Sequence, residues 1–434
     1  MVKKLLTIEK DGTEGLEGKA NFLPLCLIIA SFGPYVSLTL GLRTESVVIF
    51  SLFPVALANL LIRKTNTILS YPPLSLLLVL WIFVTLWTLG STFIDGIKYT
   101  SFKRMLGYLE HYARFIAVIF VMGVFIKPSS LTEAKKLFYN ACKILILLLA
   151  VNACVVVLSL FFDTSIILDY FQAPQIDEWN VAIASKQMGR FTGIFNQPME
   201  CGLVYSIGLF TWVYIVAEKF SITMNDSFLL FLLFVGGVLS VSKVFIFGGL
   251  PLFFIYLIWT MKAKNLVKFR YIFWAIPALL ISLFLVDKWD EIGGLNYLLR
   301  FYTGYINLSL LTAGRFGEDE GILDSFAYVW NEAPINGLGF AYQTTLDNAY
   351  YEFFLQGGLV GLILYILILS SIGLTVLNNY RKHSEGKFLL ILFVLILGAG
   401  IGAPVLTLNR VSTICCVFIM LTYFIFYLYK KRPF

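Results

Sequence analysis

Long apolar runs recur along almost the whole chain, and they limit what it can fold into more than any other feature. A helix needs about 20 apolar residues to cross the hydrocarbon core of a bilayer. The runs are continuous and do not alternate apolar with polar residues, so they predict helices and not barrel strands. The sequence therefore predicts an all-α, polytopic transmembrane helical bundle.

The composition supports this prediction. Of 434 residues, 59% are hydrophobic and only 14% are charged, whereas soluble domains carry about 25% charged residues. The mean hydropathy of +0.83 leaves too little polar surface for a set of soluble domains. It also excludes a disordered chain and a disulfide scaffold.

We expect about twelve spans, because twelve helices of about 20 residues account for roughly half of the chain. They run over residues 22–40, 45–62, 71–92, 107–126, 137–162, 193–217, 227–242, 244–261, 269–286, 349–376, 388–407 and 411–429. The spans 227–242 and 244–261 share a tight turn, so a re-entrant pair is the alternative there.

Basic residues set the predicted orientation, because Lys and Arg collect in cytoplasmic loops. With the N-terminus inside, most Lys and Arg fall in inside segments, and 1–21 and 430–434 become cytoplasmic tails. These loops account for the formal charge of +7, so no nucleic-acid partner is expected. One basic cluster, from Lys98 to Arg114, falls outside. We expect it to lie on the outer interface as an amphipathic segment.

Two outside segments are long, 163–192 and 287–348, and the second separates the transmembrane parts 22–286 and 349–429. Acidic residues outnumber basic ones in 287–348. Loops of that length are usually functional, and a simple pore or carrier would not require one.

Cysteine and histidine predict no metal site. The six cysteines lie in apolar runs and the chain has two histidines, so neither a disulfide nor a zinc site is indicated. The sequence has no Asp-x-Asp pair of the kind that holds Mg²⁺ with a nucleotide sugar. We therefore expect no metal and no cofactor.

The first candidate site lies at 189–198, where the first long outer loop enters a span. Arg190 is expected at the membrane surface, and Glu200 follows inside the apolar run. A carboxylate in lipid usually marks a partner or a site. The alternative is structural: Arg190 extends to the lipid headgroups and Glu200 pairs with it.

The second and third candidates are single cations. Lys243, in Ser-Val-Ser-Lys, is either an interface anchor or a fixed cation facing a phosphate. Arg315 is isolated among acids, so it is either a site residue or the partner of Glu318 or Asp319. The stretch 324–330 that follows predicts a short helix packed on the membrane face.

The fourth candidate lies where the long loop re-enters the membrane, at Asp347-Asn348-Ala349-Tyr350. Asp347 is either a site residue or the N-cap of the incoming helix, since Asp and Asn are favoured caps. Glycines at 357–361 allow close helix packing.

In this order, the motifs resemble those of the bacterial O-antigen polymerase and O-antigen ligase superfamily, over about residues 185–365. They are Gly-Arg-x-x-Gly-x-Phe-x-x-Pro (189–198), Ser-x-Ser-Lys (240–243), Gly-Arg (314–315), Pro-x-x-Gly-x-Gly (334–339) and Asp-Asn-x-Tyr with Gly-Gly-x-x-Gly (347–361). Relatives commonly carry Arg where this chain has Lys243. Ligases often carry His where this chain has Asp347, which favours a polymerase.

The resemblance implies a GT-C-like glycosyltransferase of the bacterial inner membrane, with both termini cytoplasmic. Its substrate would be an undecaprenyl-diphosphate-linked oligosaccharide on the outer face. The growing glycan would leave its carrier and join the next lipid-linked repeat unit. Besides membrane lipids, a chain-length regulator and a flippase are partners that the resemblance leaves open.

As the glycosyl–phosphate bond breaks, negative charge develops on the lipid diphosphate, and fixed cations stabilise that charge. Arg190 and Arg315 are expected on the diphosphate oxygens, with Lys243 in support. Asp347 is the candidate general base, and Glu200 is the reserve. The other residues expected to contact substrate are Gly337, Gly339, Asn348 and Tyr350.

Two alternatives remain. A ligase would transfer finished glycan to lipid A-core. A lipid-linked oligosaccharide flippase or other transporter would place its charges mid-membrane within broken helices, whereas this sequence places them at the outer edge.

Overall fold

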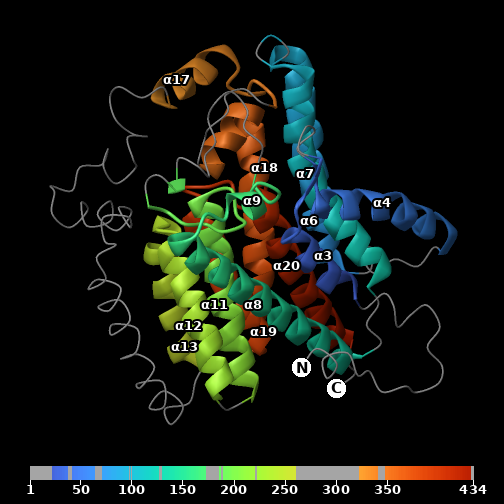
Figure 1. The fold of residues 1–434 in the computed structure, drawn as a ribbon. Helices are drawn as coiled ribbons and strands as arrows, with labels where there is room; N and C mark the ends of the chain where they lie inside the picture. Colours follow the sequence, from blue (N-terminus) through green and yellow to red (C-terminus); the bar gives the residue numbers. More distant parts are fainter. Residues whose placement is uncertain are drawn as a thin grey trace.

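The computed structural model describes residues 22–37, 42–63, 71–96, 98, 100–126, 130–172, 185–186, 189–219, 222–260, 322–340 and 348–431. Within these ranges the protein is mainly helical (Figure 1), and seven helices are long and apolar enough to cross a membrane. It is therefore a helical membrane protein. The expected span 269–286 and most of the expected loop 287–348 lie outside the described residues.

The seven long helices are α4 (Thr44–Arg63), α6 (Pro72–Ser91, continued by the π-helical η1, Thr92–Gly96), α7 (Phe102–Phe125), α8 (Leu131–Phe161), α11 (Pro198–Lys219), α18 (Ala349–Asn379) and α20 (Asn409–Lys431). Each of them overlaps one predicted apolar run, and α7, α8 and α11 begin five or six residues from the expected starts.

Shorter elements fill the remaining described ranges. They are α3 (Leu23–Ser31), strands β1 (Tyr35–Ser37) and β2 (Leu42–Arg43), α9 (Ser165–Leu168), α12 (Met224–Leu239), the π-helical η2 (Val244–Gly249), α13 (Leu250–Thr260), α17 (Ile322–Glu332) and α19 (Ser384–Ala399). The predicted helix at 324–330 is thus confirmed as part of α17.

The first expected span, 22–40, is wrong for residues 32–37, and residues 38–40 lie outside the described ranges. Helix α3 ends at Ser31, and the chain turns into an antiparallel hairpin in which Tyr35 pairs with Arg43. Pro34 explains the break, because proline lacks an N–H and disfavours helical backbone in the residue before it. A second difference is the start of α11 at Pro198, since the expected span began at 193.

Most of the basic segment from Lys98 to Arg114 belongs to α7, and its expected place on the outer interface stays a prediction. Helix α7 begins at Phe102, where Ser101 accepts a hydrogen bond from the backbone N–H of Arg104 at 3.3 Å, and it continues without a break. Arg114 is buried inside the bundle. Its carboxylate partner is Glu110, one helical turn earlier, with Nη2 and Oε1 2.6 Å apart.

Helices α11 and α20 form the centre of the bundle, and nearly all of their side chains are buried. Small residues let neighbouring helices approach α11 closely. A methyl group at Gly202 would overlap Ser242, and one at Gly208 would overlap Leu149 of α8. Close approach through small residues is how apolar helices gain packing contacts in a membrane.

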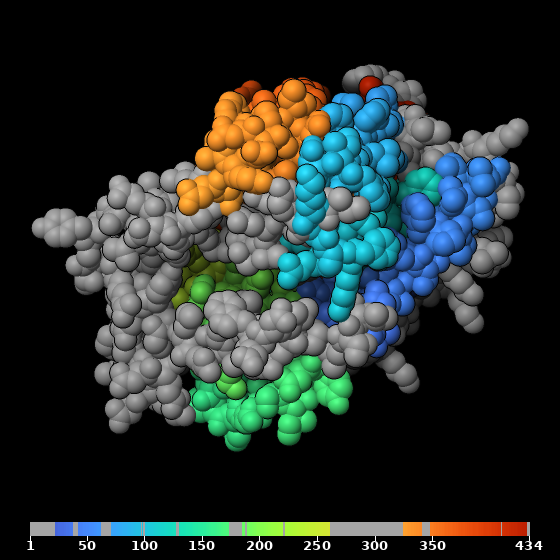
Figure 2. Space-filling view, turned by 90° about the horizontal axis from the view of Figure 1, so that it is seen from above, coloured from blue at the N-terminus to red at the C-terminus, as the bar shows by residue number. Residues whose placement is uncertain are grey.

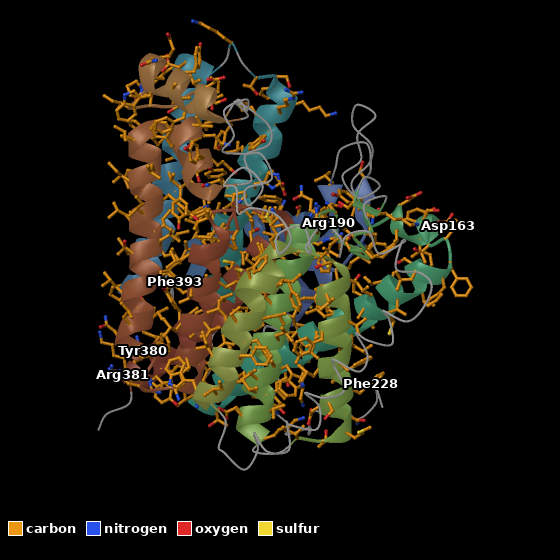
Figure 3. All side chains as sticks on the ribbon, turned by 90° about the vertical axis from the view of Figure 1, so that its left-hand side faces the viewer. Asp163, Arg190, Phe228, Tyr380, Arg381 and Phe393 are labelled. Carbon is orange, nitrogen blue, oxygen red and sulfur yellow. The ribbon has the colours of Figure 1, made fainter. Side chains whose placement is uncertain are left out.

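The bundle has two ends that matter for function. Arg190 lies at the upper ends of α11 and α12, whereas Tyr380 and Arg381 lie at the opposite end (Figure 3). We call these the Arg190 end and the Lys430 end. Helix α20 connects them, beginning at Asn409 near the first and reaching Lys431 at the second.

Candidate functional site

The first predicted motif forms a buried loop just before α11. Gly189 and Gly193 have φ angles of 70° and 60°, which is left-handed backbone that glycine adopts without strain. A methyl group at Gly193 would overlap the side chain of Asn152. We call residues 189–197 the motif loop, and its glycines are explained by this conformation.

Asn152 of α8 holds the motif loop in place. Its Oδ1 accepts a hydrogen bond from the backbone N–H of Ile194 at 2.9 Å, and its Nδ2 donates to the Tyr205 hydroxyl at 3.0 Å. Asn152 is almost fully buried. The loop is thus part of the bundle interior and does not extend into solvent.

The structure brings the first and second motifs together. The Arg190 guanidinium donates to the carbonyl of Val241 at 3.2 Å, and the backbone N–H of Phe191 donates to the carbonyl of Leu239 at 2.9 Å. Lys243 follows directly, partly buried, at the start of η2. In the part of the chain that the structure describes, Val241 is the one non-glycine residue with positive φ. Such strained backbone is common at functional sites.

Glu200 is fully buried in the first turn of α11. Its Oε1 lies 3.6 Å from Nη1 of Arg43, and its Oε2 accepts a hydrogen bond from the backbone N–H of Asn196 at 3.1 Å. The ion-pair partner of Glu200 is therefore Arg43. The expectation that it pairs with Arg190 is wrong.

Arg43 connects Glu200 to further buried charges. Its Nη1 lies 3.6 Å from Oε1 of Glu45, and Nη1 of Arg114 lies 3.7 Å from the same oxygen. Arg114 in turn pairs with Glu110. We call the set Arg43, Glu45, Glu110, Arg114, Glu200 and Arg410 the charge cluster.

Arg410 attaches α20 to the motif loop. Its Nη1 donates to the carbonyl of Ile194, and its Nη2 donates to the carbonyl of Phe171 at 2.7 Å. The guanidinium also lies 5.6 Å from the centre of the Phe195 ring. Because Arg410 is fully buried, it fixes the loop against the centre of the bundle.

The charge cluster is electrically balanced, since its arginines and glutamates are equal in number. Burial alone would lower the pKa of Arg43, but the carboxylates of Glu200 and Glu45 outweigh it and raise that pKa above its usual value. Arg43 therefore stays protonated. The cluster carboxylates pair with arginines, and no group of three His, Cys, Asp or Glu suited to a metal ion occurs among the described residues.

Several cluster atoms make no hydrogen bond within the described part of the chain. They are Nη1 of Arg43, both carboxylate oxygens of Glu45, Nη1 of Arg114, Oε1 of Glu200 and Nε of Arg410. A buried polar atom without a hydrogen bond costs stability. Several of them in one place distinguish this region from the rest of the core.

Sequence reasoning missed Arg43, Glu45, Glu110, Arg114 and Arg410. One signal was present, because Glu110 and Arg114 are four residues apart on an apolar helix, which is the spacing of a helical ion pair. Arg43 and Arg410 gave no local signal, since each lies between two apolar runs like an ordinary loop residue.

The Pro-x-x-Gly-x-Gly motif (334–339) lies against α18 next to the Gly-Gly-x-x-Gly stretch (357–361). Backbone N–H groups of Leu338 and Gly339 donate to the carbonyls of Leu355 and Gln356, both at 2.8 Å. These carbonyls are free to accept because Gly358, with φ of 62°, interrupts α18. Seen from above in Figure 2, this orange region abuts the blue and cyan segments around η1, where Thr92 accepts a hydrogen bond from the N–H of Phe340 at 2.7 Å.

Gly337 and Gly339 have a packing role in this contact. Their φ angles are 70° and 75°, and a methyl group would overlap the backbone of Gly358 at the first position and of Thr92 at the second. Their expected contact with substrate stays a prediction.

Asn348 is the N-cap of α18, accepting a hydrogen bond from the backbone N–H of Tyr351 at 3.2 Å. The alternative that Asp347 caps this helix is therefore wrong. The Tyr350 hydroxyl donates to the carbonyl of Leu397 at 3.3 Å. Asp347 and Arg315 lie outside the described residues, so their expected roles stay predictions.

Comparison of the sequence with known proteins adds no assignment. No family model matches the chain, and no curated protein matches it.

Proposed function

We propose that the protein is an integral-membrane glycosyltransferase that polymerises a surface glycan. It transfers the growing chain from a polyprenyl diphosphate carrier to the next lipid-linked repeat unit. The observation that carries the proposal is the surroundings of the motif loop. Arg190 lies on the loop beside Val241, Arg410 binds the loop carbonyl at Ile194, and Arg43 pairs with Glu200 just after it.

In this chemistry, the bond between the anomeric carbon and the diphosphate oxygen breaks, and a bond from that carbon to the acceptor hydroxyl oxygen forms. The leaving diphosphate gains negative charge. Arg190 and Arg315 bind its oxygens through their planar forks, and Lys243 adds a point charge. Asp347 takes the hydroxyl proton, while Gly337, Gly339, Asn348 and Tyr350 line the path of the substrate.

The charge cluster has a positioning role in this proposal. Arg43 and Arg114 face carboxylates, and Arg410 binds carbonyls, so these cations are already engaged within the protein. By fixing the motif loop they hold Arg190 in one place, which lowers the cost of reorganising the site during reaction. Glu200 serves as the counter-ion of Arg43 and is not used as a base.

The proposed location is the bacterial inner membrane, with the Arg190 end facing outward and both termini cytoplasmic. The distribution of Lys and Arg supports this orientation. A reporter that is active only outside the cytoplasm should be inactive when fused after Lys431. It should be active when inserted at 163–165. The reverse pattern would overturn the orientation.

The test of the cationic site is Arg190→Ala in a strain whose own copy is deleted. Loss of one preorganised charge contact costs about 100- to 1,000-fold in rate, so long-chain glycan should disappear while protein remains in the membrane. Arg381→Ala is the control, because Arg381 is exposed at the opposite end. Wild-type chain length in the Arg190 variant would contradict the proposal.

Two further variants separate the roles. Arg315→Ala should also abolish polymerisation. Asp347→Asn keeps the size of the side chain and should abolish polymerisation if Asp347 is the base. Polymerase variants should leave glycan of one repeat unit attached to its acceptor, whereas variants of a ligase should leave none attached.

One observation favours a transporter as the second candidate. Ionisable groups inside a helical bundle often mark a substrate or ion pathway, and the charge cluster is such a group. Purified protein in vesicles with lipid-linked repeat units separates the two. A polymerase lengthens the glycan, while a flippase moves the units across the bilayer without lengthening them.

A further inference from the structure

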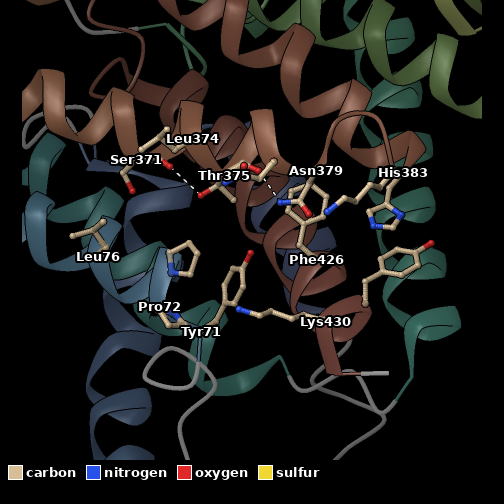
Figure 4. Close-up of a pocket in the computed structure, with 14 residues that line it drawn as sticks. Tyr71, Pro72, Leu76, Ser371, Leu374, Thr375, Asn379, His383, Phe426 and Lys430 are labelled. Carbon is tan, nitrogen blue, oxygen red and sulfur yellow. Dashed lines mark hydrogen bonds between the residues drawn. The ribbon is translucent and has the colours of Figure 1, made fainter. Parts of the chain in front are cut away.

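A cavity of about 1040 Å³ opens at the Lys430 end, opposite the proposed site (Figure 4). It lies between the start of α6, the end of α18 and the end of α20. The turn from α18 into α19 closes one side, where Lys382 and His383 line it.

The lining changes from apolar to basic along the helices. Leu76 on α6 and Leu374 on α18, both exposed, form an apolar part of the lining. Lys382 and Lys430 form a basic rim next to the ends of α18 and α20. Leu374 lies in α18, whereas Lys382 lies in the turn that follows the end of α18 at Asn379.

Among the described residues, the two rim lysines have no acidic partner. The residues that line the cavity include no Asp or Glu. Neither Lys382 nor Lys430 forms an ion pair with any residue that the structure describes. Nearby lysines differ, since Lys135 pairs with Glu385 at 3.4 Å and Lys431 lies 4.5 Å from the centre of the Tyr427 ring.

The walls are already formed. The His383 ring stacks on Tyr429 with centroids 3.5 Å apart, and Tyr71 packs edge-on against Tyr423 and Tyr427. A ligand would therefore meet a largely preformed site and pay little for ordering it.

We propose that this cavity binds an anionic phospholipid. The headgroup phosphate lies between Lys382 and Lys430, and an acyl chain follows Leu76 and Leu374 between α6 and α18. The two lysines provide the charge complement of a phosphate. The exposed apolar lining at Leu76 and Leu374 accounts for the lipid tail, which a free phosphate lacks. This site is independent of the proposed glycosyltransferase chemistry.

The test uses the full-length protein in detergent, incubated with phosphatidylglycerol or phosphatidylcholine of identical acyl chains. Bound lipid is counted by native mass spectrometry. Phosphatidylglycerol should be retained preferentially, and the double variant Lys382→Gln/Lys430→Gln should lower its retention about 25-fold, at about fivefold per lysine. The control is Lys431→Gln, which removes a neighbouring lysine that does not line the cavity.

A second variant tests the apolar part. Leu374→Trp fills the cavity and should lower retention of both lipids, whereas Leu377→Trp, on the same helix but outside the lining, should not. Equal retention of the two lipids by the wild type would overturn the proposal. So would unchanged retention in the double lysine variant, or complete displacement of phosphatidylglycerol by millimolar inorganic phosphate.

Discussion

At the Arg190 end the arginines of the charge cluster are buried and lie against carboxylates or carbonyls. At the Lys430 end, Lys382 and Lys430 are exposed and form no ion pair within the part of the chain that the structure describes. Arg43 and Arg114 face Glu45 within 4 Å, and Arg410 binds backbone carbonyls. Lys382 and Lys430 line an open cavity without an acidic residue. The difference follows from solvent, because a buried cation without a partner is too costly, while water stabilises an exposed one.

The comparison also separates the cations by how far they are buried. A charge already held by carboxylates inside the bundle organises the protein. A charge at the edge of the bundle can be shared with a substrate or lipid. Because a ligand reaches a partly buried side chain more easily than a buried one, Arg190 and Lys243 are better candidates for substrate contact than the buried Arg43.

The largest expected effect is that of Arg43→Ala, which leaves Glu45 and Glu200 buried without their shared cation. Breaking a buried ion pair on one side costs about 3–5 kcal/mol. We expect a large loss of thermal stability in detergent, measured by the folded fraction after heating. Arg381→Ala, which removes an exposed arginine at the other end, should change little.

A double variant sharpens that result. Arg43→Met with Glu200→Met removes both charges, and replacing a buried pair with apolar side chains is often neutral. It should recover part of the stability. A double variant as unstable as Arg43→Ala would contradict the assignment of Glu200 as a counter-ion.

A smaller effect on stability is expected when an asparagine is replaced by alanine, and its size should differ between the two ends. Asn152→Ala removes the acceptor for the N–H of Ile194, and an unsatisfied buried group costs about 1–3 kcal/mol. Asn378→Ala, exposed at the Lys430 end, should stay within about 0.5 kcal/mol. Equal changes in melting temperature for the two variants would contradict the view that one end is buried and the other is solvated.

The smallest effect on the folded protein is expected from salt. Raising ionic strength from about 0.1 M to about 1 M shortens the screening length from about 10 Å to about 3 Å. Phosphatidylglycerol retention should fall at the Lys430 end, while the thermal stability that depends on the buried Arg43 pairs should barely change. Salt-insensitive lipid retention would mean that the two lysines do not bind the headgroup.

The long helices could be predicted because a long apolar segment in lipid must satisfy its backbone hydrogen bonds internally, and a helix does so. Helices α4, α6 and α20 begin and end close to the expected limits. The hairpin after α3 and the cap at Asn348 were missed, because both depend on local backbone hydrogen bonds that hydropathy does not report. The motifs that contain Arg190 and Val241 are consecutive in the sequence. Nothing in either motif predicts that the two residues are in contact.

By itself, the sequence determined that the helices of this chain lie in lipid. It also determined the positions of the long apolar helices along the chain and the order of the candidate motifs. Apolar length is a local property, so it can be read residue by residue. Only the tertiary structure decided that Arg43 pairs with Glu200 and that Arg410 holds the motif loop. Those partners are far apart in the chain, and helix packing alone determines which buried charges meet.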